Sequence, residues 1–340
     1  MIRCATIGTN FVADWFMKAV QACDGITCSL VYSRNRETAE AFCGKHGAGR
    51  WCTDLMEVAE AEDVDAVYIA SPNSLHYEQA ALMLSHGKHV LCEKTITSNE
   101  AELKELIRIA GENRAVLMEA MRSVHEEGFL RLREVLPMVG TIRRVSFQYA
   151  KYSSRYDKFK EGIIENAFNP EFSNGALMDI GVYCVHPLVR LFGMPKKIIA
   201  DSLLLSNGVE GAGTILASYD GMQAELLYSK ITNNRLPSQI QGEDASMLVQ
   251  EIENIKDLRI VRKGVVQSIH FEQSDNILNY ETQEFIKMIK TGMGWEKSRE
   301  ITLETMKVLD EARRQLHIVF PAYEKSQEKK KQKKTAKEEE

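Results

Sequence analysis

The sequence predicts an α/β domain with a doubly wound parallel sheet, followed by an α+β domain with an open antiparallel sheet. Three observations support this prediction. The chain has 340 residues, which corresponds to about two domains at roughly 150 residues each. Strand and helix patterns alternate over residues 1–120, and later strands follow one another without helices between them. We therefore expect domains at 1–122 and 123–323 and a disordered charged tail at 324–340.

The first domain contains short β-branched runs that predict strands, separated by longer runs whose apolar residues have helical spacing. The expected strands are Arg3–Gly8, Thr27–Tyr32, Val64–Ala70, His89–Cys92 and Ala115–Glu119. The expected helices are Ala13–Ala22, Arg36–His46, Asp54–Ala61 and Leu75–His86. A capping box of Thr97 and Glu100 predicts the start of a fifth helix, which runs to Ala110. This alternation predicts a Rossmann-type sheet with right-handed crossovers.

The second domain has a different order of elements. A run of strands is separated by turn dipeptides such as Asn207-Gly208 and Asp220-Gly221, which predicts an antiparallel sheet. The expected strands are Ile142–Tyr149, Lys197–Leu205, Gly213–Ser218, Met222–Ser229, Leu236–Gln241, Met247–Glu251, Leu258–Val261 and Val265–Gln273. The expected helices are Glu126–Leu136, Ala176–Leu191, Asn279–Thr291 and Thr302–Phe320.

The composition argues against several classes of protein. The formal net charge is −5, so the chain lacks a basic footprint for nucleic acid. Its apolar stretches are shorter than the roughly 18 residues that cross a membrane, and the N-terminus enters a strand pattern without a signal peptide. The seven cysteines include no Cys-x-x-Cys pair, and the eight histidines lack metal-ligand spacing. We therefore expect a cytoplasmic protein with reduced thiols, no metal, and no membrane or nucleic-acid partner.

The turn between the first strand and the first helix is a candidate anion site. It comprises Gly8, Thr9, Asn10 and Phe11. Its backbone N–H groups and the positive end of the helix suit a pyrophosphate. Only Gly8 matches the glycine fingerprint of dinucleotide-binding turns, but asparagine tolerates left-handed backbone and Ala13 permits close packing of the helix. An ordinary strand–helix turn with one glycine is the alternative.

The end of the second strand bears on the choice of nucleotide. NAD-specific folds usually place an acidic residue here to hold the ribose hydroxyls, whereas this chain has Ser33 and Arg34. The small serine leaves room for a 2′-phosphate, and the guanidinium can pair with it bidentately. This argument favours NADP over NAD, with NAD still possible. The alternative is that Arg34 is an ordinary surface arginine.

Three further segments resemble one known family. They are Ala70–His76 (ASPNSLH), Gly87–Lys94 (GKHVLCEK) and Gly175–Tyr183 (GALMDIGVY). Together they resemble the Gfo/Idh/MocA family, which includes glucose–fructose oxidoreductase and inositol dehydrogenase. The resemblance covers about residues 1–322 and is specific for the family, but not for a substrate.

The resemblance implies a two-domain NAD(P)-dependent oxidoreductase whose open sheet serves as the interface of a homodimer or homotetramer. By the family pattern, the residues that line the cofactor are Ser71, Pro72, Asn73 and His76, and those that border the nicotinamide are Glu93 and Lys94. The chain departs from the family at Thr95, where proline usually follows the lysine. A cis bond before a residue other than proline costs about 3–4 kcal/mol, so the course of this loop remains open.

The helix expected at Ala176–Leu191 carries a polar stripe. Asp179, Tyr183, His186 and Arg190 fall at i, i+4, i+7 and i+11, on one face of an otherwise apolar helix. A polar stripe on a buried helix needs partners or a cavity, which favours a binding cavity here. An exposed face with solvated charges is the alternative.

Placed opposite Lys94, this stripe suggests a mechanism for hydride transfer. Tyrosine is a weak base near neutral pH, but a nearby ammonium stabilises its phenolate, so Lys94 and Tyr183 are the expected catalytic pair. The resemblance likewise implies a histidine or tyrosine as the catalytic residue at position 183. The rival assignment makes Lys94 the only acid and base. Asp179 would hold a substrate hydroxyl or orient Lys94, and His186 is a further substrate contact or proton carrier.

Other residues and functions are weaker candidates. Arg122 is expected near the cofactor, and Arg155 and Asn166 in the long connection at 150–170 are candidate substrate contacts, although ordinary loop residues are the more common case. We expect hydride transfer between nicotinamide and a sugar, polyol or trans-diol. The alternatives are an NAD-dependent glycosidase of the same family and a catalytically silent nucleotide-binding sensor.

Overall fold

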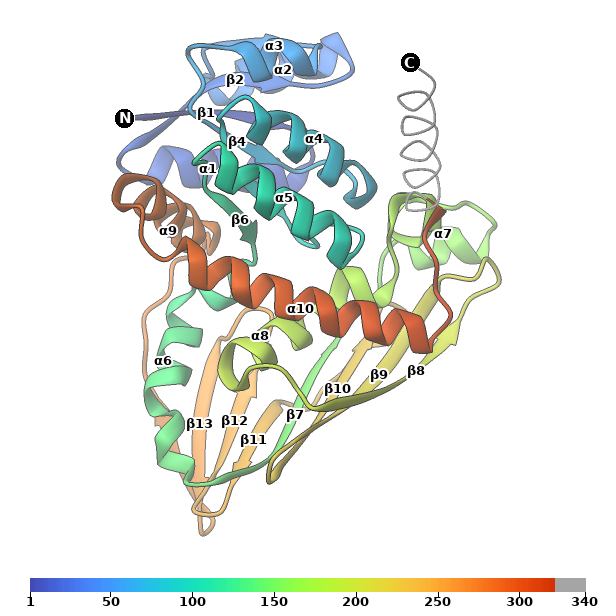
Figure 1. Cartoon of the computed structure of the whole chain (residues 1–340). Helices are drawn as coiled ribbons and strands as arrows, with labels where there is room; N and C mark the ends of the chain where they lie inside the picture. Colours follow the sequence, from blue (N-terminus) through green and yellow to red (C-terminus); the bar gives the residue numbers. More distant parts are fainter. Residues whose placement is uncertain (322–340) are drawn as a thin grey trace.

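The computed structural model describes residues 1–321, which fold around two sheets, one in the upper and one in the lower half of Figure 1. The tail predicted at 324–340 lies outside the described residues. The chain passes from the first sheet to the second after Ala120, and we therefore propose the domain boundary at 122/123, as the sequence indicates.

The first sheet is parallel and has six strands in the order β3-β2-β1-β4-β5-β6. Its strands are β1 (Ile2–Ile7), β2 (Ile26–Tyr32), β3 (Arg50–Cys52), β4 (Ala66–Ile69), β5 (His89–Glu93) and β6 (Leu117–Ala120). Its helices are α1 (Phe11–Ala22), α2 (Arg36–His46), α3 (Leu55–Glu60), α4 (Asn73–Ser85) and α5 (Glu100–Glu112). The predicted doubly wound sheet is confirmed. The sequence missed β3, because a three-residue edge strand is too short to show a pattern.

The order of this sheet reverses direction between β1 and β4. In open α/β sheets, ligands bind outside the carboxyl ends of the strands at such a switch point. The segments that leave β1, β4, β5 and β6 therefore all arrive at one edge, and these segments contain most of the residues selected from the sequence.

The second sheet has eight strands in the order β14-β13-β12-β11-β7-β10-β9-β8. All neighbours are antiparallel except β7 and β10, which are parallel. The strands are β7 (Ile142–Ala150), β8 (Lys197–Leu204), β9 (Glu210–Tyr219), β10 (Met222–Ser229), β11 (Ser238–Gly242), β12 (Ser246–Gln250), β13 (Asp257–Arg262) and β14 (Val265–Ile269). The predicted open, mainly antiparallel sheet is thus confirmed.

Some helices of the second half pack against this sheet, and others contact the first half. The α-helices are α6 (Glu127–Val135), α7 (Tyr156–Lys160), α8 (Val182–Phe192), α9 (Leu278–Thr291) and α10 (Trp295–Gln315). Short 3₁₀ segments occur at η1 (Arg122–Val124), η2 (Leu136–Val139), η3 (Asn166–Phe168) and η4 (Pro170–Phe172). The long helix α10 contacts α8 and β8 below and α5 and β6 above, so it joins the two sheets (Figure 1).

Two helices differ from the expectation. The helix predicted at Ala176–Leu191 begins as a π-helical turn, η5 (Leu177–Gly181), before continuing as α8. The last helix begins at Trp295, seven residues before the predicted Thr302, and ends at Gln315. Its first turns are charged and exposed, so they lack the apolar periodicity on which the prediction depended.

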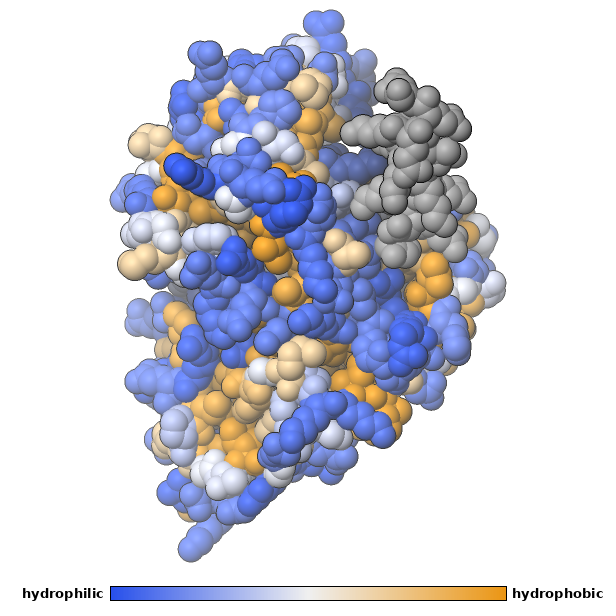
Figure 2. Space-filling view, in the orientation of Figure 1, coloured by the Kyte–Doolittle hydropathy of each residue, from blue (hydrophilic) through white to orange (hydrophobic). Residues whose placement is uncertain are grey.

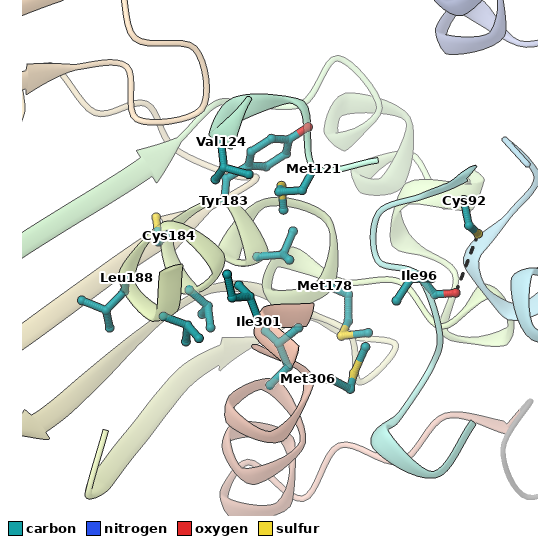
Figure 3. Packing of buried hydrophobic residues seen from close by; sticks show 14 of the residues in the cluster. Cys92, Ile96, Met121, Val124, Met178, Tyr183, Cys184, Leu188, Ile301 and Met306 are labelled. Atoms are coloured by element: carbon teal, nitrogen blue, oxygen red, sulfur yellow. Dashed lines mark hydrogen bonds between the residues drawn. The ribbon is translucent and has the colours of Figure 1, made fainter. Parts of the chain in front are cut away.

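A large hydrophobic cluster fixes α8 between the second sheet and α10. Figure 3 shows Leu188 and Ile301 among the buried side chains of this cluster, with Met178 and Met306 close to each other. Full burial of each such side chain contributes about 1.5–3 kcal/mol. The ring of Tyr183 packs beside Val124, but its hydroxyl points away from the cluster (Figure 3). The core therefore holds the tyrosine in place while leaving its oxygen available.

The surface seen in Figure 2 is mostly hydrophilic, with hydrophobic patches on the sheet domain below α10. One apolar segment, Pro170–Phe192, has the length and composition of a membrane span, but 78% of the tested window is buried within the structure. A core helix of a globular domain has the same properties. All seven cysteines are buried and unpaired, as the sequence predicts.

Candidate active site

A cavity of about 380 Å³ lies where the carboxyl ends of the first sheet meet the second domain. The start of α1 forms one wall, the segments after β5 and β6 a second, and the second sheet with η5 and α8 a third. The residues that line it are Phe11, Val12, Trp15, Glu93, Lys94, Arg122, Tyr149, Lys151, Tyr152, Ser153, Ser154, Asp179, Ile180, Tyr183, Lys230 and Leu278.

Lys94 projects from the end of β5 to the π-helical turn of the second domain. Its ammonium donates to the backbone carbonyl of Asp179 at 2.7 Å and to Oδ1 of the same residue at 2.8 Å. An ammonium has three N–H donors, so one remains for a ligand in the cavity. Burial disfavours its charge, but Asp179 outweighs burial and holds the pKa of Lys94 above its ordinary range. Lys94 therefore remains protonated at neutral pH.

Lys230 is a second buried lysine at this site, and sequence reasoning did not select it. Its ammonium lies 2.8 Å from Oδ2 of Asp179 and donates to the carbonyl of Ala167 at 2.5 Å. Although burial opposes ionisation, Lys230 and Lys94 together hold the pKa of the Asp179 carboxyl well below its ordinary range. The only sequence signal is a lysine directly after the apolar strand β10, where the chain turns back into the protein.

Tyr183 lies between two cations. Its ring centroid is 5.0 Å from the ammonium of Lys94 and 5.2 Å from the guanidinium of Arg122. Arg122 also donates from Nε to the tyrosine oxygen at 3.1 Å. Both cations would stabilise negative charge that develops on this oxygen when it exchanges a proton with a substrate. The structure thus brings Lys94, Asp179, Tyr183 and Arg122 together, as the sequence predicts.

Two buried carboxyl groups, those of Glu93 and Glu281, lie near the cations of this site. Tyr68 donates to Glu93 at 2.5 Å, and Glu281 on α9 is fully buried, with neither carboxylate oxygen hydrogen-bonded within residues 1–321. Burial raises the pKa of both carboxyl groups. Sequence reasoning missed Glu281, because one glutamate on an amphipathic helix resembles any solvated residue.

The polar stripe continues beyond the cavity. Eleven residues of α-helix span about 16 Å, so only the first part of the stripe can line a cavity of this size. His186 is buried with Nε2 at 4.0 Å from the carboxylate of Glu119, and Arg190 lines a different cavity. The expected substrate contact from His186 therefore finds no support, because its side chain faces the protein interior.

The long connection contributes other residues than those selected from the sequence. Arg155 and Asn166 are exposed and do not line the cavity, and Arg155 lies 3.5 Å from Glu165. Aromatic contacts of Tyr156 and Phe159 with Phe168 fold this connection onto itself. The residues at 152–154 lie on the side of the connection that faces the cavity.

The turn after β1 fits a dinucleotide. Gly8 has φ of +114°, and a Cβ there would lie 2.8 Å from the carbonyl oxygen of Ala70. Asn10 has extended backbone, not the left-handed form considered from the sequence. Its side chain instead caps the N–H groups of Val12 and Ala13 at 3.0 Å and donates to Ala70 at 2.8 Å. This cap pins the helix start to β4, while Thr9 and Phe11 remain at the turn that would face a pyrophosphate.

The segment after β4 mainly holds the loops in place. His76 has no exposed surface, so its side chain does not line the cavity, and its ring lies 2.8 Å from the carbonyl of Ser71 and 3.0 Å from that of Thr95. The peptide bond between Lys94 and Thr95 is cis, which answers the question left open by the missing proline. The Thr95 hydroxyl donates to the carbonyl of Met178 at 2.6 Å and ties this loop to the second domain.

The remaining residues of this segment lie at the start of α4. Pro72 precedes the helix, and the side chain of Ser71 donates to Gln79 at 2.7 Å. Asn73 donates to the carbonyl of Ser173 at 3.2 Å, which links the two domains. These contacts position the loop beside the nucleotide edge of the sheet.

Ser33 and Arg34 lie where β2 ends, at the same edge of the sheet. Arg34 is exposed and forms no ion pair or hydrogen bond with the described residues. Its guanidinium is thus free to meet a phosphate. Within residues 1–321, no group of three or more histidine, cysteine, aspartate or glutamate side chains could hold a metal ion.

A dinucleotide-type sheet that opens onto proton-transferring side chains defines a nicotinamide-dependent oxidoreductase. Residues 2–121 match the family model described as "Oxidoreductase family, NAD-binding Rossmann fold", and residues 129–248 match the "GFO/IDH/MocA C-terminal domain". The chain belongs to the Gfo/Idh/MocA family of oxidoreductases.

Two curated relatives and one solved structure illustrate the range of the family. The chain is 45% identical to scyllo-inositol 2-dehydrogenase (NADP(+)) IolU of Bacillus subtilis (strain 168), over 95% of this chain and 99% of the relative. It is 25% identical to trans-1,2-dihydrobenzene-1,2-diol dehydrogenase of Xenopus tropicalis, over 86% and 90%. The aldose-aldose oxidoreductase of Caulobacter crescentus, solved with glycerol, has a TM-score of 0.84 at 19% identity, with coverage of 93% and 97%.

Proposed function

We propose that this protein is an NADP-dependent dehydrogenase of a cyclic polyol or vicinal diol. The observation that carries the proposal is the pairing of Lys94 with Asp179 next to Tyr183, with one ammonium N–H free to bind a substrate oxygen. The relative that oxidises scyllo-inositol with NADP supports both the cofactor and the class of substrate.

Each of these side chains has a distinct role in the oxidation of an alcohol. Bound NADP supplies a nicotinamide carbon that accepts a hydride. Lys94 donates a hydrogen bond to the reacting oxygen and stabilises the charge that develops there. The phenolate form of Tyr183 accepts the hydroxyl proton and becomes the phenol, with Arg122 holding its oxygen at 3.1 Å. Asp179 orients both buried lysines and keeps Lys94 charged.

A substrate screen tests this function. The purified chain is incubated with NADP⁺ and, separately, scyllo-inositol, myo-inositol, glucose and a trans-cyclohexanediol, and absorbance of the reduced nicotinamide is followed. We expect turnover with at least one cyclic polyol or diol. Tight NADPH binding without turnover of any substrate would instead favour the silent sensor, and release of a sugar from an aryl glycoside in a parallel incubation would favour the glycosidase.

The preference for NADP depends on Arg34. Replacing it with glutamine should weaken NADPH binding by about 10- to 100-fold, since a charge-assisted hydrogen bond contributes about 1.5–3 kcal/mol. NADH binding should change less than twofold, and the control Arg114→Gln should change neither. Fluorescence titration with both nucleotides measures the effect, and equal losses for NADH and NADPH would contradict the 2′-phosphate contact.

We further propose that the open face of the second sheet binds a second copy of this chain. Ile199, Leu203, Leu216 and Leu227 are each 42–54% exposed, and Ile199 lies directly opposite Leu216 on the neighbouring strand. Arg144 and Glu225, which pair with each other at 2.8 Å, lie on strands of the same sheet. An apolar patch beside charges of both signs suits a self-complementary dimer interface.

Light scattering coupled to size exclusion tests this interface. The unchanged chain should elute as a dimer or tetramer, and Leu216→Glu should shift it to a smaller species. Leu130→Glu places the same charge on an exposed leucine of α6 and should leave the mass unchanged. A monomeric wild-type chain would contradict the proposal.

The cytoplasm remains the expected compartment. Seven buried, unpaired thiols are typical of proteins in a reducing environment. Fractionation of the source cells would test this expectation.

A further inference from the structure

Two adjoining cavities lie at the far end of the polar stripe, outside the catalytic cavity. Their volumes are about 460 Å³ and 270 Å³, and both are lined by His125, Arg133, Arg190 and Glu284. The side chains come from α6, α8 and α9 and from the residue after η1. None of these residues lines the catalytic cavity, so the site is separate from the one described above.

The lining contains two unpaired guanidinium groups. Arg133 and Arg190 form no ion pair or hydrogen bond with any residue in 1–321, and Nε of Arg190 is inaccessible to solvent without an acceptor. The one carboxylate common to both cavities, Glu284, is already bound by Lys287 at 3.0 Å. Glu127 also lines the larger cavity, and the charge of Glu284 acts on Arg190, but neither carboxylate pairs with Arg133 or Arg190 among the described residues.

The electrostatic effects of these side chains on one another agree with this description. Burial, followed by the charge of Arg133, lowers the pKa of Arg190 to about 10. Burial, followed by the charge of Arg190, lowers the pKa of His125 to about 3. Two guanidinium groups that repel each other beside a cavity are stabilised when an anion binds between them.

We propose that these cavities bind a small phosphate-bearing metabolite, with its phosphate between Arg133 and Arg190. Planar guanidinium groups bind the oxygens of phosphate bidentately, and two of them balance a dianion. The joined cavities exceed the size of a single phosphate and leave room for an organic part. This proposal does not depend on the substrate of the hydride transfer.

Calorimetric titration with inorganic phosphate tests the site. The protein is saturated with NADPH, which fills the phosphate position beside Arg34, and chloride at matched ionic strength serves as reference. We expect saturable phosphate binding, and Arg190→Gln and Arg133→Gln should each weaken it by about tenfold or more. Arg131→Gln on the same helix removes a guanidinium that is paired with Glu134 and should leave binding unchanged.

Two further measurements complete the test. Glucose 6-phosphate should bind at least as tightly as inorganic phosphate, and its exclusion would overturn the organic part of the proposal. If Arg190→Gln fails to fold by circular dichroism, Arg190→Lys keeps the charge and removes the bidentate geometry, and it should still weaken binding. The site would be overturned if the unchanged holoprotein did not bind phosphate, or if both arginine variants bound phosphate as tightly as the unchanged holoprotein.

Discussion

Replacing Lys94 with methionine is expected to lower the kcat for polyol oxidation by about 10³-fold, within the 10²–10⁴ range typical of lost acid–base assistance. Methionine keeps most of the side-chain volume but removes the ammonium next to Asp179 and Tyr183. The reacting oxygen then loses its donor, and the phenol loses one of its two neighbouring cations. Steady-state kinetics with NADP⁺ and the best substrate of the screen measures the loss.

The same variant should bind NADPH nearly as well as the unchanged protein, because the contacts of the turn after β1 are intact. Lys104→Met is the matched control, since it removes an exposed lysine that pairs with Glu100 at 2.8 Å on the surface of α5. That control should retain activity within twofold. Full activity of Lys94→Met would exclude the proposed mechanism.

Replacing Tyr183 with phenylalanine should lower kcat by about 10²–10⁴-fold, because the substrate hydroxyl then loses its proton acceptor. Asp179 holds the pKa of Lys94 above its ordinary range, so Lys94 stays an ammonium between about pH 6 and pH 9. A rise of the oxidation rate with pH in this interval therefore cannot come from Lys94 losing its proton.

This comparison separates the two assignments of the proton acceptor. If Lys94 alone were the acid and base, Tyr183→Phe would change mainly KM and leave kcat nearly as in the unchanged protein. Tyr219→Phe is the control, because its hydroxyl donates to Gly193 at 3.0 Å, outside the cavity. It should leave the kcat as in the unchanged protein.

Local patterns determined much of this protein. The alternation of strands and helices determined the parallel sheet, and the turn dipeptides determined the succession of antiparallel strands, since both patterns arise between residues close in sequence. The helical spacing of Asp179 and Tyr183 placed them on one face, and the end of β5 placed Lys94 at the ligand-binding edge of the sheet. These inferences need only the periodicity of the elements and the topology of the fold.

Only the tertiary structure decided which polar residues share the cavity. Lys230, which directly follows β10 and lies 51 residues further along the chain, joins Asp179, and Glu281 comes from α9. Conversely, packing turns His186 inward and leaves Arg155 and Asn166 at the surface. Contacts of this kind depend on how distant segments pack and on where a helix passes the edge of a cavity, and neither leaves a periodic trace in the sequence.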